Sequence, residues 1–171
     1  MFWKSSLFLI GMLMVFSTLT AQLADLEEKK PVMINGVEYG YIIKNEQTKS
    51  NKGEEYARFE ITLYASNMSG CTKLFADRNA TFSTDDPNLL VTFNCSNANG
   101  KRLTAKSGTI KAKDFNVNAK VKEGDKEVNR WVKAGYIFRN GETLKTNIIV
   151  LVPLNQRPVI NCSLNYLPEL Q

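Results

Sequence analysis

Histidine is absent from the 171 residues of this chain, and its absence excludes several kinds of chemistry. Catalysis by a serine or cysteine nucleophile that needs an imidazole base is excluded, and the commonest metal ligand of proteins is missing. The three cysteines are 24 and 67 residues apart, so they form no Cys-x-x-Cys unit of the kind found in zinc sites. We therefore expect a non-enzymatic protein with no catalytic residue, no metal site and no cofactor.

A phosphate-binding glycine loop is also missing, because the glycines fall in expected hairpins or strands. After residue 21 no apolar run is long enough to span a bilayer as a helix. Hydrophobic residues make up 43% of the chain and charged residues 23%, which is typical of soluble globular domains. A chain of about 150 residues can bury one hydrophobic core, so we expect a single domain at residues 22–171.

The first 21 residues have the pattern of a secretory signal peptide. Lys4 supplies an early positive charge, the residues from Leu7 to Phe16 are apolar or small, and Ala21 is a small residue at the expected cut. The apolar run is too short to span a bilayer, so we predict a helical leader at residues 1–21 that is cleaved. The mature chain is then expected to be secreted or periplasmic.

Strand patterns follow one another along the mature chain, and no amphipathic helix is indicated. The segment from Glu54 to Ala65 alternates between apolar and polar residues, as a strand with one buried face does. Asn35 and Gly36, and also residues 139–142, are strong hairpin signals, and residues 45–53 are predicted to be a polar loop. We count eight or nine strands and predict an all-β fold, a single antiparallel β-sandwich.

The alternation changes phase near Lys113. Ile110 and Ala112 share one face of a strand, whereas the apolar residues that begin with Phe115 require the opposite phase. Either a β-bulge or a bend from one sheet to another would produce this change. The polar, charged start of the mature chain, residues 22–30, gives no strand pattern.

Cys95 and Cys162 are predicted to point inward, because Cys95 shares a strand face with Phe93 and Cys162 shares one with Ile160. A Cys95–Cys162 disulfide is one interpretation, since an oxidising compartment permits it. Two buried free thiols are the other, because free cysteine is among the most buried residue types. Cys71 follows a turn segment and is expected nearer the surface.

The 67-residue gap between Cys95 and Cys162 resembles that of the inter-sheet disulfide in immunoglobulin domains. Trp131 comes too late to be the strand-C tryptophan of that family, and Ile160 stands at the position of its tyrosine corner. The resemblance therefore implies an immunoglobulin-like or jelly-roll-like sandwich and no binding residue.

Several segments resemble those of short exported proteins of the Bacteroidetes group. They begin at Gly36 (GVEYGY), Phe59 (FEITLY), Ser69 (SGCTKLF) and Tyr136 (YIFRNGETL), and the leader that ends just before Gln22 is similar too. The resemblance implies export and a single domain, and it implies no activity.

A basic stretch is the better candidate for a binding surface. Residues 101–133 contain ten Lys or Arg residues and four acids. Lys120 and Lys122 lie on the outward face of their strand, and Trp131 and Lys133 project to one side of the next strand. Such a face suits a polyanion such as an anionic glycan, whereas export argues against nucleic acid. The other interpretation is a solvated strand whose lysines discourage edge pairing.

Tyr56 and Tyr64 form a second candidate face, on the outward side of the strand at residues 54–65. Outward tyrosines suit a glycan platform or a protein interface, and they are core residues if another sheet covers them. The preferred hypothesis is an exported, non-enzymatic β-sandwich that binds or supports another envelope or surface component, a protein or an anionic glycan. The alternative is a carrier whose strands close as a barrel around a lipid-like ligand.

Overall fold

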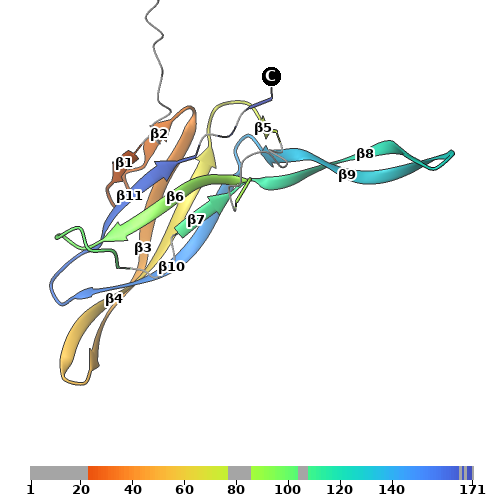
Figure 1. Cartoon of the computed structure of the whole chain (residues 1–171). Helices are drawn as coiled ribbons and strands as arrows, with labels where there is room; N and C mark the ends of the chain where they lie inside the picture. Colours follow the sequence, from red (N-terminus) through yellow and green to blue (C-terminus); the bar gives the residue numbers. More distant parts are fainter. Residues whose placement is uncertain (1–22, 77–85, 104–107, 166, 168, 171) are drawn as a thin grey trace, which may run out of the picture.

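The computed structural model describes residues 23–76, 86–103, 108–165, 167, 169 and 170. Every secondary-structure element in these residues is a β-strand (Figure 1). In these residues no helix is present that could cross a membrane. The leader predicted at residues 1–21 lies outside the described residues. Eleven strands form three antiparallel sheets, which confirms the all-β prediction.

The first sheet, which we call the β6 sheet, has the strand order β1-β11-β6-β7. Its strands are β1 Leu23–Leu26, β11 Val159–Leu164, β6 Leu89–Ser96 and β7 Gly108–Lys111. Phe93, Cys95 and Ile160 are buried on its inner face, as the alternation predicts.

The second sheet, which we call the β4 sheet, has the strand order β10-β4-β3-β2. Its strands are β10 Thr143–Pro153, β4 Glu54–Asn67, β3 Val37–Asn51 and β2 Val32–Ile34. The alternation of β4 is confirmed, because its apolar face is buried: Ala57, Phe59, Ile61, Leu63 and Ala65. These side chains belong to one core with the inner face of the β6 sheet, so the two sheets form the predicted sandwich.

The third sheet has the strand order β5-β9-β8, and most of it lies outside the sandwich. Its strands are β5 Lys73–Phe75, β9 Lys126–Phe138 and β8 Lys113–Glu123. On β8 and β9 only residues 135–138 are buried, and the last three of them pair with β5, whose Lys73 and Phe75 are also buried. The rest of β8 and β9, residues 115–135, is a two-stranded ribbon that extends away from the sandwich, and we call it the arm (Figure 1).

The strand count predicted from the sequence is too low, and the loop predicted at residues 45–53 is wrong. β1 lies within residues 22–30 and pairs with β11. β3 continues to Asn51 and turns into β4 through Lys52 and Gly53, both of which have positive φ. This end of the hairpin extends beyond the core and is largely exposed, so its strands carry no apolar alternation (Figure 1).

The two predicted hairpin turns have different outcomes. Asn35 and Gly36 both have positive φ and join β2 to β3, as predicted. The turn at residues 139–142 also forms, with the Glu142 amide donating to the Arg139 carbonyl at 3.1 Å. However, β9 and β10 do not pair, so the predicted hairpin is wrong and the chain changes sheets at this turn. A local turn signal does not select the strand that the next segment pairs with.

The phase change near Lys113 is a bend from one sheet to another, which is one of the two predicted alternatives. β7 ends at Lys111 in the β6 sheet, and β8 begins at Lys113 in the third sheet, with Ala112 buried between them. This switch carries the chain out of the sandwich and into the arm.

Cys95 and Cys162 are buried as predicted, but both are free thiols, so the structure has no bridge between them. Cys95 lies opposite Ile160 and Cys162 lies opposite Phe93, which makes the two cysteines diagonal neighbours on paired strands. Diagonal residues are about 7–8 Å apart, whereas a disulfide needs Cβ atoms about 4 Å apart. Cys71 is exposed, as predicted.

The described strands leave each of the three sheets with two edge strands instead of closing it on itself. A carrier of the kind considered above needs a closed barrel around its ligand. The pairing of the described strands does not provide one.

Candidate functional site: a projecting arm

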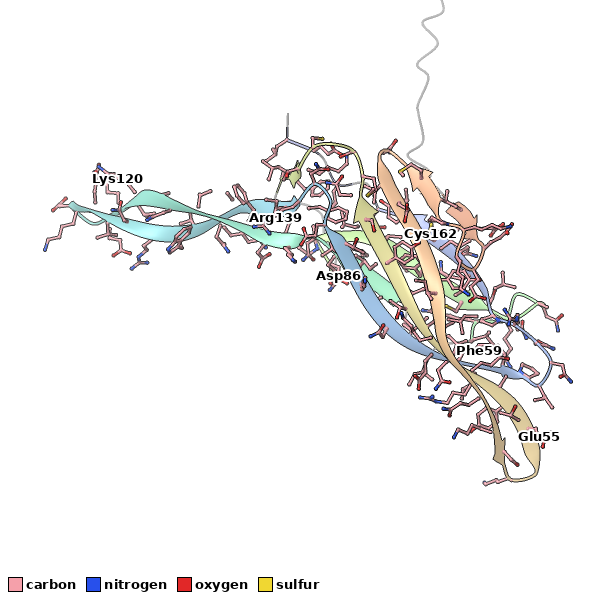
Figure 2. All side chains as sticks on the ribbon, turned by 180° about the vertical axis from the view of Figure 1, so that it is seen from behind. Glu55, Phe59, Asp86, Lys120, Arg139 and Cys162 are labelled. Carbon is pink, nitrogen blue, oxygen red and sulfur yellow. The ribbon has the colours of Figure 1, made fainter. Side chains whose placement is uncertain are left out.

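The arm is the most prominent feature outside the sandwich. β8 has 11 residues and pairs with β9 along its whole length, with one bulge between Phe115 and Asn116. At about 3.3 Å per residue, such a strand is about 36 Å long. In Figure 2, Lys120 lies near the free end of the arm, and Arg139 lies where the arm joins the sandwich.

Alternation gives the arm two different faces. The valine face carries partly buried apolar side chains and the exposed ion pair of Arg130 with Glu123; the apolar side chains are Phe115, Val117, Ala119, Val121, Val128 and Val132. The Trp131 face carries exposed, mostly polar side chains: Asn116, Asn118, Lys120, Lys122, Glu127, Asn129, Trp131 and Lys133. The structure therefore brings four of the six predicted binding residues to one face.

Trp131 is the most exposed large hydrophobic side chain among the described residues, at 74%. It lies opposite Asn118, near the middle of the arm. Tryptophan buries more apolar area than other side chains and is enriched among the residues that dominate binding energy at interfaces. An indole held this far out of the core is suited to contact another molecule.

The lysines of the Trp131 face differ in their surroundings. Lys120 lies 3.7 Å from Glu127, and both are exposed, so this ion pair contributes little. Lys133 donates to the Tyr136 hydroxyl at 2.8 Å and lies 3.3 Å from Asp114. The hydrogen bond with Tyr136 is the main cause that raises the pKa of Lys133. Among the described residues Lys122 has no ion-pair partner, so it is the lysine of this face that is most available to an acidic group.

The basic stretch as a whole does not form one surface. Lys101 and Arg102 lie in the connection between β6 and β7, and Lys111 on β7 pairs with Asp86. Lys106 lies outside the described residues. Residues 113–138, which span β8, β9 and the turn between them, contain six basic residues and four acids, so this part of the chain is only slightly basic. The exposed indole, more than charge, distinguishes the Trp131 face.

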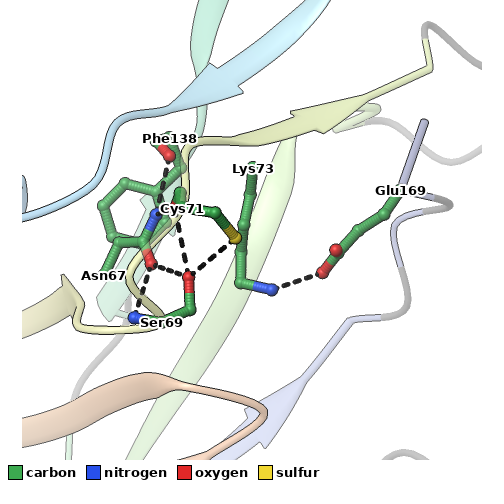
Figure 3. A network of polar contacts seen from close by, with 6 residues as sticks. All are labelled: Asn67, Ser69, Cys71, Lys73, Phe138 and Glu169. Atoms are coloured by element: carbon green, nitrogen blue, oxygen red, sulfur yellow. Dashed lines mark hydrogen bonds and ion pairs between the residues drawn. The ribbon is translucent and has the colours of Figure 1, made fainter. Parts of the chain in front are cut away.

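Asn67 holds the root of the arm to the end of β4 (Figure 3). Its side chain is fully buried, and its amide donates to the carbonyl of Phe138 at 2.8 Å and to that of Cys71 at 2.9 Å. Its side-chain oxygen accepts from the amide of Ser69 at 3.1 Å and from its hydroxyl at 2.6 Å. A buried amide with all its partners in place fixes the segments that it joins.

The C-terminal residues hold the root from the other side. The buried Lys73 on β5 donates to Glu169 at 2.7 Å (Figure 3). The amide of Leu170 donates to the carbonyl of Leu74 at 2.8 Å. Glu169 also pairs with Phe75 as an isolated bridge. β5 therefore lies between β9 and the C-terminal segment and is bonded to both.

A third set of contacts joins the root to β10. Glu142 forms ion-paired contact with Lys113 and accepts from the Arg139 amide at 3.0 Å. Burial raises the pKa of Glu142, but the hydrogen bonds from Lys113 and Arg139 outweigh this and leave it lowered. Three groups of polar contacts therefore anchor the root of the arm, whereas no other described strand packs on the rest of it.

A ribbon that is anchored at its root and carries an exposed indole beyond it has the features of a recognition element. The chain matches no protein-family model, no curated protein and no solved structure. The function is therefore inferred from the surfaces of the molecule itself.

Tyr56 and Tyr64 lie on the outer face of the β4 sheet, as predicted, and not on the arm. Both are partly buried, and the Tyr64 phenol lies over Gly40 on β3, where a Cβ atom would come within 2.6 Å of its hydroxyl. Figure 2 shows Glu55, the neighbour of Tyr56, at the opposite end of the molecule from Lys120. The two predicted binding faces are therefore separate surfaces.

The remaining reactive groups are buried or dispersed. Burial raises the pKa of Cys95 to about 11 and also raises that of Cys162, so both thiols stay protonated at neutral pH. In the part of the chain that the structure describes, no cluster of three or more Cys, Asp or Glu side chains is placed to hold a metal ion.

Proposed function

We propose that this chain is an exported, non-enzymatic β-sandwich protein that binds another component of the cell envelope or surface through the Trp131 face of its arm. The observation that carries the proposal is the 74% exposure of Trp131 on a ribbon whose root is anchored by Asn67, Lys73 and Glu142. Anchoring reduces the entropy that is lost when a partner binds, because the arm is already ordered.

Export is supported by the residues of the leader, from Lys4 to Ala21. The absence of histidine from the sequence supports a function without acid–base or nucleophilic catalysis. The two buried thiols lack the reactivity of a catalytic cysteine because burial raises their pKa values.

A protein is the partner that this face fits best, since a central indole surrounded by Asn118, Asn129 and lysines resembles the centre of a protein interface. An anionic glycan would depend on Lys120 and Lys122 and would be released by salt. The weak net charge of the arm favours the protein.

The test is capture of the partner from a native envelope fraction by the tagged protein, compared with its Trp131→Ala variant. We expect a defined partner with the wild type and its loss with the variant, and Lys122→Ala should weaken capture less. Tyr56→Ala is the matched control, because Tyr56 is an outward aromatic on the other candidate face and should leave capture unchanged. Equal capture by wild type and Trp131→Ala would contradict the proposal.

A further inference from the structure

The valine face of the arm has no second layer over it in the described part of the chain (Figure 1). Its six apolar side chains are covered only in part, by their neighbours on the same ribbon. An isolated two-stranded ribbon is marginally stable in water and needs a packed layer on its apolar face. The face opposite Trp131 is therefore expected to be covered in the working protein.

An apolar strip of similar character lies on β10. Ile149 and Leu151 are 55% and 46% exposed on the outer face of the β4 sheet, and β10 is the edge strand of that sheet. Arg58 and Glu60, which lie opposite them on β4, pair with each other at 2.5 Å. The strip therefore lies beside an ion pair whose two charges compensate each other.

The arm and β10 have matching lengths and a common origin. β8 and β10 each have 11 residues, and β10 begins directly after the turn at the root of the arm. From this root the arm and β10 extend in different directions (Figures 1 and 2). A two-fold axis beside the root would lay the arm of each of two copies along β10 of the other.

We infer that two copies of the chain exchange arms, with the valine face of each arm packed on Ile149 and Leu151 of the other copy. Val121 lies six residues from Phe115 at the root, and Ile149 lies six residues from Thr143 at the same root. Val121 and Ile149 are therefore equally far along their strands from the root, and in the exchanged arrangement they contact each other across the interface. The inference goes beyond the proposed function, because it uses the opposite face of the arm and leaves Trp131 exposed.

The area that would be buried favours this arrangement over simpler ones. A two-stranded ribbon about 36 Å long and about 10 Å wide presents roughly 350 Å² on one face. Two reciprocal contacts then bury roughly 1,400 Å², within the range of about 1,200–2,000 Å² found in stable protein interfaces. Two arms packed only on each other would bury roughly 700 Å², which is typical of weak or adventitious contacts.

The test is the molar mass of the purified protein, measured by light scattering across a range of concentrations. We expect twice the mass of one chain for the wild type and the mass of one chain for Val121→Lys and for Leu151→Lys. Asn118→Lys adds the same charge to the opposite face of the arm, and Thr109→Lys adds it to the far face of the sandwich. Both controls should remain dimeric.

A second measurement keeps the inference testable if a variant folds poorly. In a Cys71→Ser background, cysteines at positions 121 and 149 should form a disulfide between copies on mild oxidation, with neither single cysteine variant doing so. Within one chain these positions lie on the free part of the arm and on the sandwich, so a bond between them joins two copies (Figure 2).

A wild type with the mass of one chain at every concentration would overturn the inference. So would a dimer that Val121→Lys dissociates and Leu151→Lys does not, since this is the behaviour of arms packed only on each other. Loss of partner capture in Trp131→Ala with the dimer intact would leave the inference standing. The failure of one proposal is therefore distinguishable from the failure of the other.

Discussion

The side-chain amide of Asn67 donates to the backbone carbonyl of Phe138 at 2.8 Å, and this bond joins residues that are 71 positions apart in the chain. It connects the end of β4, in the middle of the sandwich, to the end of β9, at the root of the arm. Two backbone bonds reinforce it, because the Asn67 amide donates to Glu142 and the Gly141 amide donates to Asn67. The direction of the arm is thus set by the core of the protein.

Replacing Asn67 with Ala should destabilise the protein on the order of 3 kcal/mol, because the carbonyls of Phe138 and Cys71 would lose their buried donor. The free energy of unfolding is measured by urea denaturation. Asn118→Ala is the control, since Asn118 is exposed on the arm, and its effect should stay within about 0.5 kcal/mol. Equal effects of the two substitutions would contradict the anchoring role of Asn67.

One thiol of the native protein should react rapidly with a soluble thiol reagent, and all three should react after unfolding. Cys71 is exposed, whereas Cys95 and Cys162 are buried and burial raises the pKa of both. The Cys71→Ser variant should show no rapid reaction. A native protein with only one reactive thiol even after unfolding without a reductant would indicate a Cys95–Cys162 bridge.

Stability should fall as the pH rises from about 9 to about 11. The Cys95 thiol has an ordinary pKa of 9.0, and burial raises it to about 11 in the folded chain. The unfolded chain therefore loses this proton first, so the contribution is complete below pH 9 and is lost as the pH approaches 11. The loss is on the order of 2 kcal/mol.

The control for this pH dependence is the Cys95→Ala variant, whose urea midpoint should fall less over the same range. Tyr39 also has a pKa raised by burial, but its ordinary value is 10.0 and it is present in both proteins, so its contribution cancels in the comparison. Parallel pH profiles of the two proteins would contradict the assignment to Cys95.

The sandwich could be predicted from the sequence because apolar alternation reports burial directly. Phe59, Ile61 and Leu63 alternate with polar residues, and all three are buried in the core. The extended end of the β3–β4 hairpin was missed because both of its faces meet water, so residues 45–51 carry no alternation. Residues that form strands outside a core give no such signal.

The faces of the arm could also be read from the sequence, but its position could not. Alternation assigned Lys120, Lys122, Trp131 and Lys133 correctly to one side of their strands. The same alternation made Val117 and Val121 look like core residues, although they lie on the bare ribbon. Asn67, which fixes the root, is only a turn residue in the sequence, because its partner Phe138 is distant along the chain.

The most direct test of the arm as the binding element is photo-cross-linking in the native envelope. A photoreactive residue is placed at position 131 in one variant and at position 56, on the other candidate face, in a second. The account predicts one discrete cross-linked product with a different protein at position 131 and no product with a different protein at position 56. Products with a different protein at position 56 alone would show that the arm is not the surface that binds.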